Sequence, residues 1–351
     1  MSIFSETTPA ELGYRMPAEW EKQEAIWYSW PHSEDTWPEV FPNIPKVFAE
    51  MVFHLSQTQE VKINVLDTEH EVKVRAILEA NGANLSLVKF YHIPTNDSWC
   101  RDHGPTFVVR EVDGKTEKAI VNWNFNSWGS KYPYELDNAV PSEILKYQPL
   151  PSFNPGIVLE GGSIEVNGAG SVLTTRACLL NKNRNPHLSQ TQIEDYLKAY
   201  LGIKQVLWLE DGILGDDTDG HIDDLSRFVN ENTIVTIVED DTTDGNHRLL
   251  EENLHLLRSM KNLDGKPFDI ITLPMPEPVV LQGIRLPASY ANFLIANNVV
   301  LIPFFNDKSD QKALDILQGC FPTRKVIGIN CRELVLGLGT LHCVSQQEPA
   351  A

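Results

Sequence analysis

Helical spacing of apolar residues recurs along the whole of this 351-residue chain, and the recurrence limits the folds open to it. Apolar side chains at i, i+3 and i+4 are typical of a helix with one buried face. The helix starts return at roughly 50 to 70 residues, an interval that suggests repeated supersecondary units. Helices are expected over 45–57, 68–80, 136–147, 190–201, 247–261 and 309–319.

Runs of strand-type residues follow several of these helices. Strands are expected over 85–90, 204–209, 269–273 and 325–329. A hairpin is expected between 163–167 and 171–175, joined through Gly168-Ala-Gly170. The sequence therefore predicts an α/β protein made of repeated units.

Composition argues against several classes of protein. The formal net charge of −19 disfavours a nucleic-acid partner and mildly favours a cationic ligand. The five cysteines lack CxxC spacing, which argues against disulfides and a zinc site and fits a reducing compartment. No segment approaches the roughly 18 continuous apolar residues of a membrane span, and residues 1–10 lack the features of a secretory signal. We therefore expect a cytoplasmic protein without membrane contact.

Polar clusters follow the predicted units at similar offsets. Asp102, Glu160, His221 and Cys343 each lie beyond a helix and the strand after it. If the units surround an axis, these positions converge on a common pocket. The unit after the helix at 247–261 should contribute the segment 283–292 in the same way.

Three side chains of that segment are candidates for lining the pocket. They are Arg285, Ser289 and Asn292. We expect them to bind the substrate, as part of a segment that lines the pocket.

Cys343 is the candidate nucleophile, although it lies only eight residues from the end of the chain. A thiol reacts at neutral pH when a base, a cation or the substrate's charge stabilises its thiolate. His342 is a poor partner, because neighbours along an extended strand point to opposite faces. His221 is the better proton carrier, and Glu160 could orient its imidazole.

Asp102 and Asp223 lack a basic partner in their own motifs, apart from Arg101 beside Asp102. In extended conformation His221 and Asp223 would face the same way. Two inward carboxylates suit a planar guanidinium, which gives each of them two parallel hydrogen bonds. Attack by the thiolate, loss of ammonia and hydrolysis would convert a guanidine to a urea without a metal or an organic cofactor.

Each signal taken alone has a simpler interpretation. A single Cys is more often a buried small hydrophobe, and this interpretation is kept for Cys100, Cys178, Cys320 and Cys331. The acidic run 216–224 lacks EF-hand spacing and offers one His, so a metal site is not expected. Glu160-Gly-Gly162 is followed by strand-type residues rather than a helix, unlike a dinucleotide loop.

Taken together, the motifs resemble the agmatine deiminase family, which is related to bacterial peptidylarginine deiminases among the guanidino-group-modifying enzymes. The resemblance runs through nearly the whole chain, so residues 1–351 are expected to form one catalytic domain. The segments that carry it are Met16–Trp20, Trp27–Pro31, Asn96–Pro105, Glu160–Ser163, Leu180–Pro186, Thr218–Asp223, Ala288–Asn292 and His342–Gln347.

The resemblance implies a five-bladed α/β propeller (pentein) of ββαβ units, with pseudo-fivefold symmetry and a central active site. It implies hydrolysis of agmatine to N-carbamoylputrescine and ammonia. Cys343 would be the nucleophile and His221 the acid and base, while Asp102 and Asp223 bind the guanidinium beside Glu160. Trp99 would pack on the alkyl chain of the ligand.

Two departures from the family pattern concern the tail of the substrate. A Glu often precedes Thr-Asp-Gly-His and meets the distal ammonium, whereas this chain has Asp217. A glycine-rich approach to the Cys is interrupted here by Leu338, Thr340 and Leu341.

The substrate expected is thus a small guanidino cation, and three alternatives stay open. They are a deiminase for free or peptidyl arginine, which would need a cation such as Arg285 at the far end, an amidinotransferase, and a non-catalytic agmatine- or polyamine-binding module. A homo-oligomer is also left open.

Overall fold

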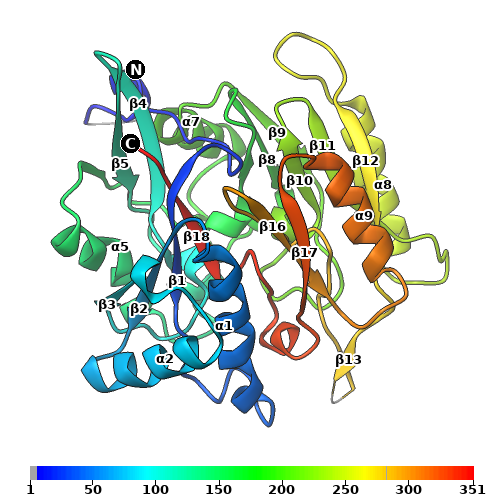
Figure 1. Cartoon of the computed structure of the whole chain (residues 1–351). Coiled ribbons are helices and arrows are strands. Elements are labelled where there is room, and N and C mark those ends of the chain that lie inside the picture. Colours follow the sequence, from blue (N-terminus) through cyan, green and yellow to red (C-terminus); the bar gives the residue numbers. More distant parts are fainter. Residues whose placement is uncertain (1–5, 282) are drawn as a thin grey trace.

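The computed structural model describes residues 6–281 and 283–351. In this part of the chain, one connection repeats five times: an antiparallel pair of strands, a helix, and a strand parallel to the second member of the pair. Helices lie towards the outside of the molecule and the strands lie further in (Figure 1). The repeat predicted from helix spacing is therefore a ββαβ unit.

Four of the units are continuous in sequence. Their elements are β4 (Thr106–Val112), β5 (Lys115–Val121), α5 (Glu135–Tyr147) and β6 (Ser152–Phe153); β7 (Glu165–Val166), β8 (Ser171–Thr175), α7 (Gln190–Leu201) and β9 (Gln205–Leu209); β10 (Ser226–Asn230), β11 (Thr233–Val238), α8 (His247–Ser259) and β12 (Asp269–Pro274); β15 (Leu294–Ile295), β16 (Val299–Phe304), α9 (Asp310–Cys320) and β17 (Lys325–Asn330).

The fifth unit joins the two ends of the chain. Strand β18 (Ser345–Pro349) pairs antiparallel with β1 (Gln23–Ser29), which is followed by α1 (Ile44–Leu55) and the parallel strand β2 (Glu60–Val65). Helix α2 (Thr68–Ala80) and strand β3 (Val88–His92) extend this sheet. Strand β18 lies in the middle of the molecule in Figure 1. It begins two residues after Cys343, and its pairing with β1 holds this end of the chain in place.

Short elements connect the units. They are α3 (Cys100–His103), α4 (Ser127–Ser130), α6 (Arg176–Leu179), the hairpin β13 (Val280–Leu281) and β14 (Ile284–Arg285), and the 3-10 turns η1 (Ala10–Leu12), η2 (Phe41–Asn43), η3 (Leu85–Leu87), η4 (Gly161–Ser163), η5 (Ile222–Asp224) and η6 (Leu334–Gly337).

The predicted helices all form and start within one residue of their expected positions. Local chemistry explains the sharpness of some ends. Helix α7 begins with a capping box, in which Ser189 and Gln192 exchange side-chain and backbone hydrogen bonds. It ends at Gly202, whose φ of 66° suits a left-handed cap.

Two strand predictions need correction at their first residues. Leu85–Leu87 is a 3-10 turn rather than a strand, because the Asn84 side chain accepts from the backbone N–H of Ser86. Ser163 likewise belongs to η4, where its hydroxyl donates to the carbonyl of Glu160. The predicted hairpin forms, with β7 paired to β8 across Gly168-Ala-Gly170.

None of the helices among the described residues has the length and apolar character needed to cross a bilayer. Residues 1–5 lie outside the described residues. They belong to the segment 1–10, which is not expected to be a secretory signal.

Candidate active site

Each of the five units is preceded by a short segment that carries a candidate residue. Because the segments occupy the same place in every unit, they all reach the same end of their sheets. The residues and the strands that follow them are Asp102 before β4, Glu160 before β7, His221 and Asp223 before β10, Ser289 and Asn292 before β15, and Cys343 before β18.

Contacts join the first three segments. The backbone N–H of Gly162 donates to Asp102 Oδ1 at 2.9 Å. His221 lies between the two neighbouring acids, with Nδ1 3.8 Å from Asp102 Oδ1 and Nε2 3.9 Å from Glu160 Oε2. A Cβ at position 162 would lie 2.6 Å from His221 Nδ1, so only glycine allows these groups to approach one another.

The remaining segments close the ring. Asn292 Nδ2 lies 3.0 Å from Asp224 Oδ1 and 3.1 Å from the Cys343 sulfur, so it connects the third, fourth and fifth segments. The backbone N–H of Arg101 donates to the carbonyl of Cys343 at 3.0 Å, and this bond links the fifth segment to the first. The convergence expected from sequence is therefore observed as a cycle of contacts.

The Cys343 thiol lies in an acidic and buried environment. Its sulfur is 3.8 Å from Asp223 Oδ2, and the side chain is 5% exposed. Burial raises the pKa of the thiol well above 9, and the negative charges of Asp223, Asp224 and Asp102 raise it further. The resting thiol is therefore neutral, and a cation bound to these carboxylates would favour the thiolate.

This environment predicts the reactivity of the free protein. Iodoacetamide should alkylate Cys343 slowly at pH 7 and faster as the pH rises past 9, because the thiolate is the reactive form. Peptide mass mapping of the Cys343 adduct against time and pH measures the rate, and the Cys343→Ser variant identifies labelling elsewhere. Equal rates at pH 6 and pH 9 would contradict a neutral resting thiol.

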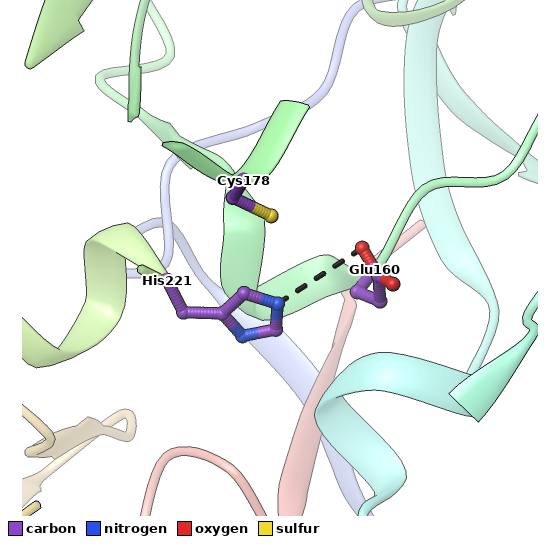
Figure 2. A group of neighbouring side chains, drawn as sticks. All are labelled: Glu160, Cys178 and His221. Carbon is purple, nitrogen blue, oxygen red and sulfur yellow. Dashed lines mark ion pairs between the residues drawn. The ribbon is translucent and has the colours of Figure 1, made fainter. Parts of the chain in front are cut away.

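His221 is buried beside a second thiol. Figure 2 shows Cys178, from α6, and Glu160 as neighbours of the imidazole. Burial lowers the pKa of His221, but the negative charges of Asp102 and Asp223 and the interaction with the Cys178 sulfur outweigh it and raise the pKa well above 6.5. The imidazole is therefore protonated at rest and has a proton to give. The sequence assigned Cys178 to the core, and its contact with His221 was not predicted.

Glu160 is held by an arginine that the sequence analysis did not select. Arg184 Nε donates to Glu160 Oε1 at 2.6 Å, and its Nη1 also pairs with Asp219. Glu160, Cys178 and His221 offer ligand atoms within 4.8 Å of one another. A metal there would compete with the Arg184 guanidinium, which already neutralises the carboxylate. Arg184 lies in the motif Leu180–Pro186, which carried part of the resemblance.

Asp102 and Asp223 present carboxylate oxygens to the same centre. Asp102 Oδ2 accepts from the indole N–H of Trp128 at 2.9 Å, and Asp223 Oδ2 is hydrogen-bonded to His342 Nδ1 at 2.7 Å. Four buried polar atoms here have no hydrogen-bond partner among the described residues. They are Asp223 Oδ1, Glu160 Oε2 and both ring nitrogens of His221. Buried polar atoms without partners are costly, so their clustering indicates a site for a polar ligand.

The local backbone differs from the extended one that was assumed. Residues 222–224 form the turn η5, so Asp223 does not share a strand face with His221. Cys343 and His342 also lie in a turn, between η6 and β18. Arg101 does not pair with Asp102, because its Nη1 donates to Gln347 and its Nε to the His342 carbonyl.

Aromatic side chains lead from the thiol towards Asp217. A Cβ at Gly339 would lie 3.1 Å from the Cys343 sulfur and 2.7 Å from the Trp99 ring. The Trp99 ring makes an edge contact with Trp128 at 6.5 Å between centroids. Trp128 in turn meets Tyr132 at 6.0 Å, and the Tyr132 hydroxyl donates to Asp217 Oδ2 at 2.8 Å. An alkyl chain that follows this wall would end at Asp217.

Asp217 already has a cationic neighbour. The Lys131 ammonium donates to the Asp217 carbonyl and lies 3.3 Å from Asp217 Oδ1 and 3.2 Å from Asp219 Oδ1. The turn before Lys131 places Ser127, Trp128 and Ser130 at positive φ. L-residues rarely adopt this conformation, which costs energy and is common at functional sites.

The fourth unit contributes in two different ways. Asn292 contacts the thiol, and the Ser289 hydroxyl donates to the Asp224 carbonyl at 2.8 Å, which supports the neighbouring turn. Arg285 lies on β14, and its guanidinium pairs with Asp244 at 2.8 Å. Among the described residues, the hydrogen bonds of the Arg285 guanidinium go to Asp244 and not to the imidazole or the paired acids, so its role in binding the tail stays a prediction.

A thiol, an imidazole and several carboxylates presented by five ββαβ units define an α/β enzyme of the guanidino-group-modifying class, the pentein superfamily. The chain belongs to the Porphyromonas-type peptidyl-arginine deiminase family, whose profile matches residues 15–349. The resemblance found in the sequence is therefore confirmed.

Full-length relatives agree. A Medicago truncatula protein named agmatine deiminase is 39% identical over an alignment 376 positions long, which covers 98% of this chain and 99% of the relative. A solved structure of Enterococcus faecalis agmatine deiminase has a TM-score of 0.90 at 32% identity and covers 99% of both chains. The C. jejuni agmatine deiminase with substrate bound has a TM-score of 0.84 at 35% identity, covering 95% of this chain and 96% of that one.

Proposed function

We propose that the protein is an agmatine deiminase, which hydrolyses agmatine to N-carbamoylputrescine and ammonia. The observation that carries the proposal is the ring of segments that gathers a thiol, a protonated imidazole and partner-free carboxylate and imidazole atoms around one centre. The full-length relatives named agmatine deiminase support the same conclusion.

The guanidinium would bind between Asp102 and Asp223 and bring its carbon to Cys343. Its positive charge offsets the carboxylates that hold the thiol neutral, so the thiol releases its proton to solvent only when the substrate is bound. The thiolate then attacks the guanidine carbon and forms a C–S bond. His221 gives its proton to the departing nitrogen, which leaves as ammonia and yields a thiouronium.

Hydrolysis would reverse the roles of the same groups. The neutral His221 takes a proton from water, and the resulting hydroxide adds to the thiouronium carbon. Collapse of this adduct breaks the C–S bond and passes the hydroxyl proton to the departing sulfur, so the urea product leaves and the neutral thiol is restored. Glu160, held by Arg184, keeps a negative charge beside the imidazole whenever it is protonated.

Ammonia release from three substrates tests the proposal. Agmatine should be turned over with a kcat/KM well above those for free arginine and for a blocked arginyl peptide. An arginine deiminase would need a cation for the substrate carboxylate, and Arg285 is neutralised by Asp244. Preferred turnover of arginine or the peptide would refute the agmatine assignment, and transfer to an added amine without ammonia release would indicate an amidinotransferase.

The aromatic wall and Asp217 predict how the tail is recognised. Asp217→Asn should raise the KM for agmatine up to about fivefold, the limit for a partly exposed ion pair. Lys131→Met should lower that KM, because the substrate ammonium no longer competes with Lys131 for the carboxylate. Steady-state kinetics with butylguanidine, which lacks the distal ammonium, is the control. Parallel changes for both substrates would show that Asp217 does not contact the tail.

A further inference from the structure

His342 precedes the nucleophile, yet both of its ring nitrogens are occupied elsewhere. Nδ1 lies 2.7 Å from Asp223 Oδ2, and Nε2 lies 3.0 Å from Glu19 Oε2. All three side chains are buried. Glu19 comes from the N-terminal segment before β1, which carries the motif Met16–Trp20 that no catalytic role has so far explained.

Counting donors fixes the charge of this imidazole. An ionised carboxylate only accepts hydrogen bonds, and a neutral imidazole has a single N–H to donate. Two carboxylate contacts therefore require either a doubly protonated ring or a protonated acid. Glu19 already accepts from the Arg227 guanidinium and from the backbone N–H of Ile295, which leaves no need for a proton on it.

The electrostatic surroundings agree with this count. Although burial raises the pKa of Glu19, the charges of Arg227 and His342 bring it to about 2. Burial also raises the pKa of Asp223, but the hydrogen bond and charge of His342 bring it below its usual value. Arg227 is the largest of the causes that lower the pKa of Glu19, so this acid is ionised and Nε2 of the imidazole donates to it.

Other charged groups around the ring complete the balance. Arg227, on β10, pairs with Glu165 of β7 at 2.8 Å as well as with Glu19. Arg101, in α3, donates to the His342 carbonyl at 3.3 Å. Glu19, Glu165 and His342 also offer ligand atoms within 4.8 Å of one another. Arg227 already bonds to both glutamates, so its guanidinium fills the place that a metal ion would need.

The contact also decides which oxygen of Asp223 is available. Oδ2 is bound to His342, whereas Oδ1 has no partner among the described side chains and backbone groups. A carboxylate fixed through one oxygen cannot rotate freely, so Oδ1 is held ready to accept. Without the contact to His342, burial and the neighbouring acids Asp102 and Asp224 would favour a protonated Asp223.

We propose that His342 is a positioning residue that, fixed by Glu19, donates from both ring nitrogens and orients Asp223 for the guanidinium. The inference rests on the proposed function of the same site. It gives the N-terminal motif a purpose, because Glu19 acts on the substrate only through His342 and Asp223.

The charge of His342 can be observed without any substrate. In protein labelled with ¹⁵N-histidine, the signals lost in His342→Gln identify its ring. Both of its nitrogens should carry protons at pH 7, because each of them contacts a carboxylate oxygen. A ring with one protonated nitrogen at pH 7 would overturn the proposal, whatever substrate the enzyme uses.

Kinetics then separate positioning from support of the fold. Glu19→Gln should lower kcat/KM for agmatine about 10- to 100-fold, as for other residues that orient a site from behind. It should also move the acid limb of the pH profile upward, because Asp223 becomes easier to protonate. The double variant Glu19→Gln/His342→Gln should have a kcat/KM no lower than that of the less active single variant, since the two substitutions break the same chain of contacts.

Glu21→Gln is the matched control. Glu21 lies in the same segment but pairs with Arg15 at the surface, so its loss should leave the rate and the pH profile unchanged. A folded Glu19→Gln variant with wild-type kinetics would overturn the proposal. Absence of agmatine turnover in the wild-type protein would instead reject the proposed function, and the NMR result would still stand.

Discussion

Cys343→Ser is expected to lower kcat for agmatine by at least about 10⁴-fold, as loss of a nucleophile does in other covalent enzymes. A serine hydroxyl is far harder to ionise than a thiol, and His221 is protonated at rest and cannot serve as its base. Binding should persist within a few fold, because the guanidinium is held by Asp102 and Asp223 rather than by sulfur. Single-turnover ammonia release and titration calorimetry measure the two effects separately.

A second thiol provides the control for this experiment. Cys320 is half-buried near the end of α9, and its replacement by serine should leave turnover unchanged. Near-normal turnover in Cys343→Ser would exclude the thiouronium route. Loss of binding together with turnover would mean that the thiol helps to build the pocket and that the two acids do not suffice.

Sequence patterns were most informative where local chemistry decides the structure. The amphipathic helices follow from spacing alone, as α7 shows with its apolar face and its capping box. The common position of Asp102, Glu160, His221 and Cys343 in the units was also predictable, because equivalent loops of a repeat lie at equivalent places. Whether residues 1–351 form a single domain stays a prediction.

The contacts that tune the site could not be read from the sequence. His342 was set aside because an extended backbone was assumed, and the turn at 341–344 lets its ring reach Asp223 and Glu19 instead. Cys178 and Arg184 reach Glu160 and His221 only through tertiary packing, more than a dozen residues away in the chain. Motif membership was the available signal for Glu19 and Arg184, since both lie in segments that carried the resemblance.

Asp223→Asn should lower kcat/KM for agmatine about 10²- to 10³-fold, the usual cost of losing one strong electrostatic contact in a preorganised site. The amide keeps the shape of the side chain but removes the negative charge that would grip the guanidinium. It also breaks the ion pair with His342, so orientation and charge are lost together. Steady-state kinetics of the folded variant gives the value.

Asp224→Asn is a close control, because burial and the charges of Asp223 and Asp216 raise the pKa of Asp224 well above 3.8. A raised pKa makes this acid more like an amide, and an amide oxygen can still accept from Asn292, so activity should stay within about threefold of wild type. A comparable loss in both variants would assign the effect to packing of η5 and not to the charge of Asp223.

Thiol reactivity provides a second test of Asp223→Asn, because alkylation of Cys343 should become faster while turnover becomes slower. The negative charge of Asp223 is, after burial, the largest cause of the raised pKa of Cys343. Its removal should lower that pKa and speed alkylation of the free enzyme at pH 8, while turnover falls. A variant that only distorted the site would slow turnover. It would also slow alkylation only if the sulfur became less accessible. Slower alkylation together with slower turnover would therefore contradict the view that one carboxylate both restrains the resting thiol and binds the cation that releases it.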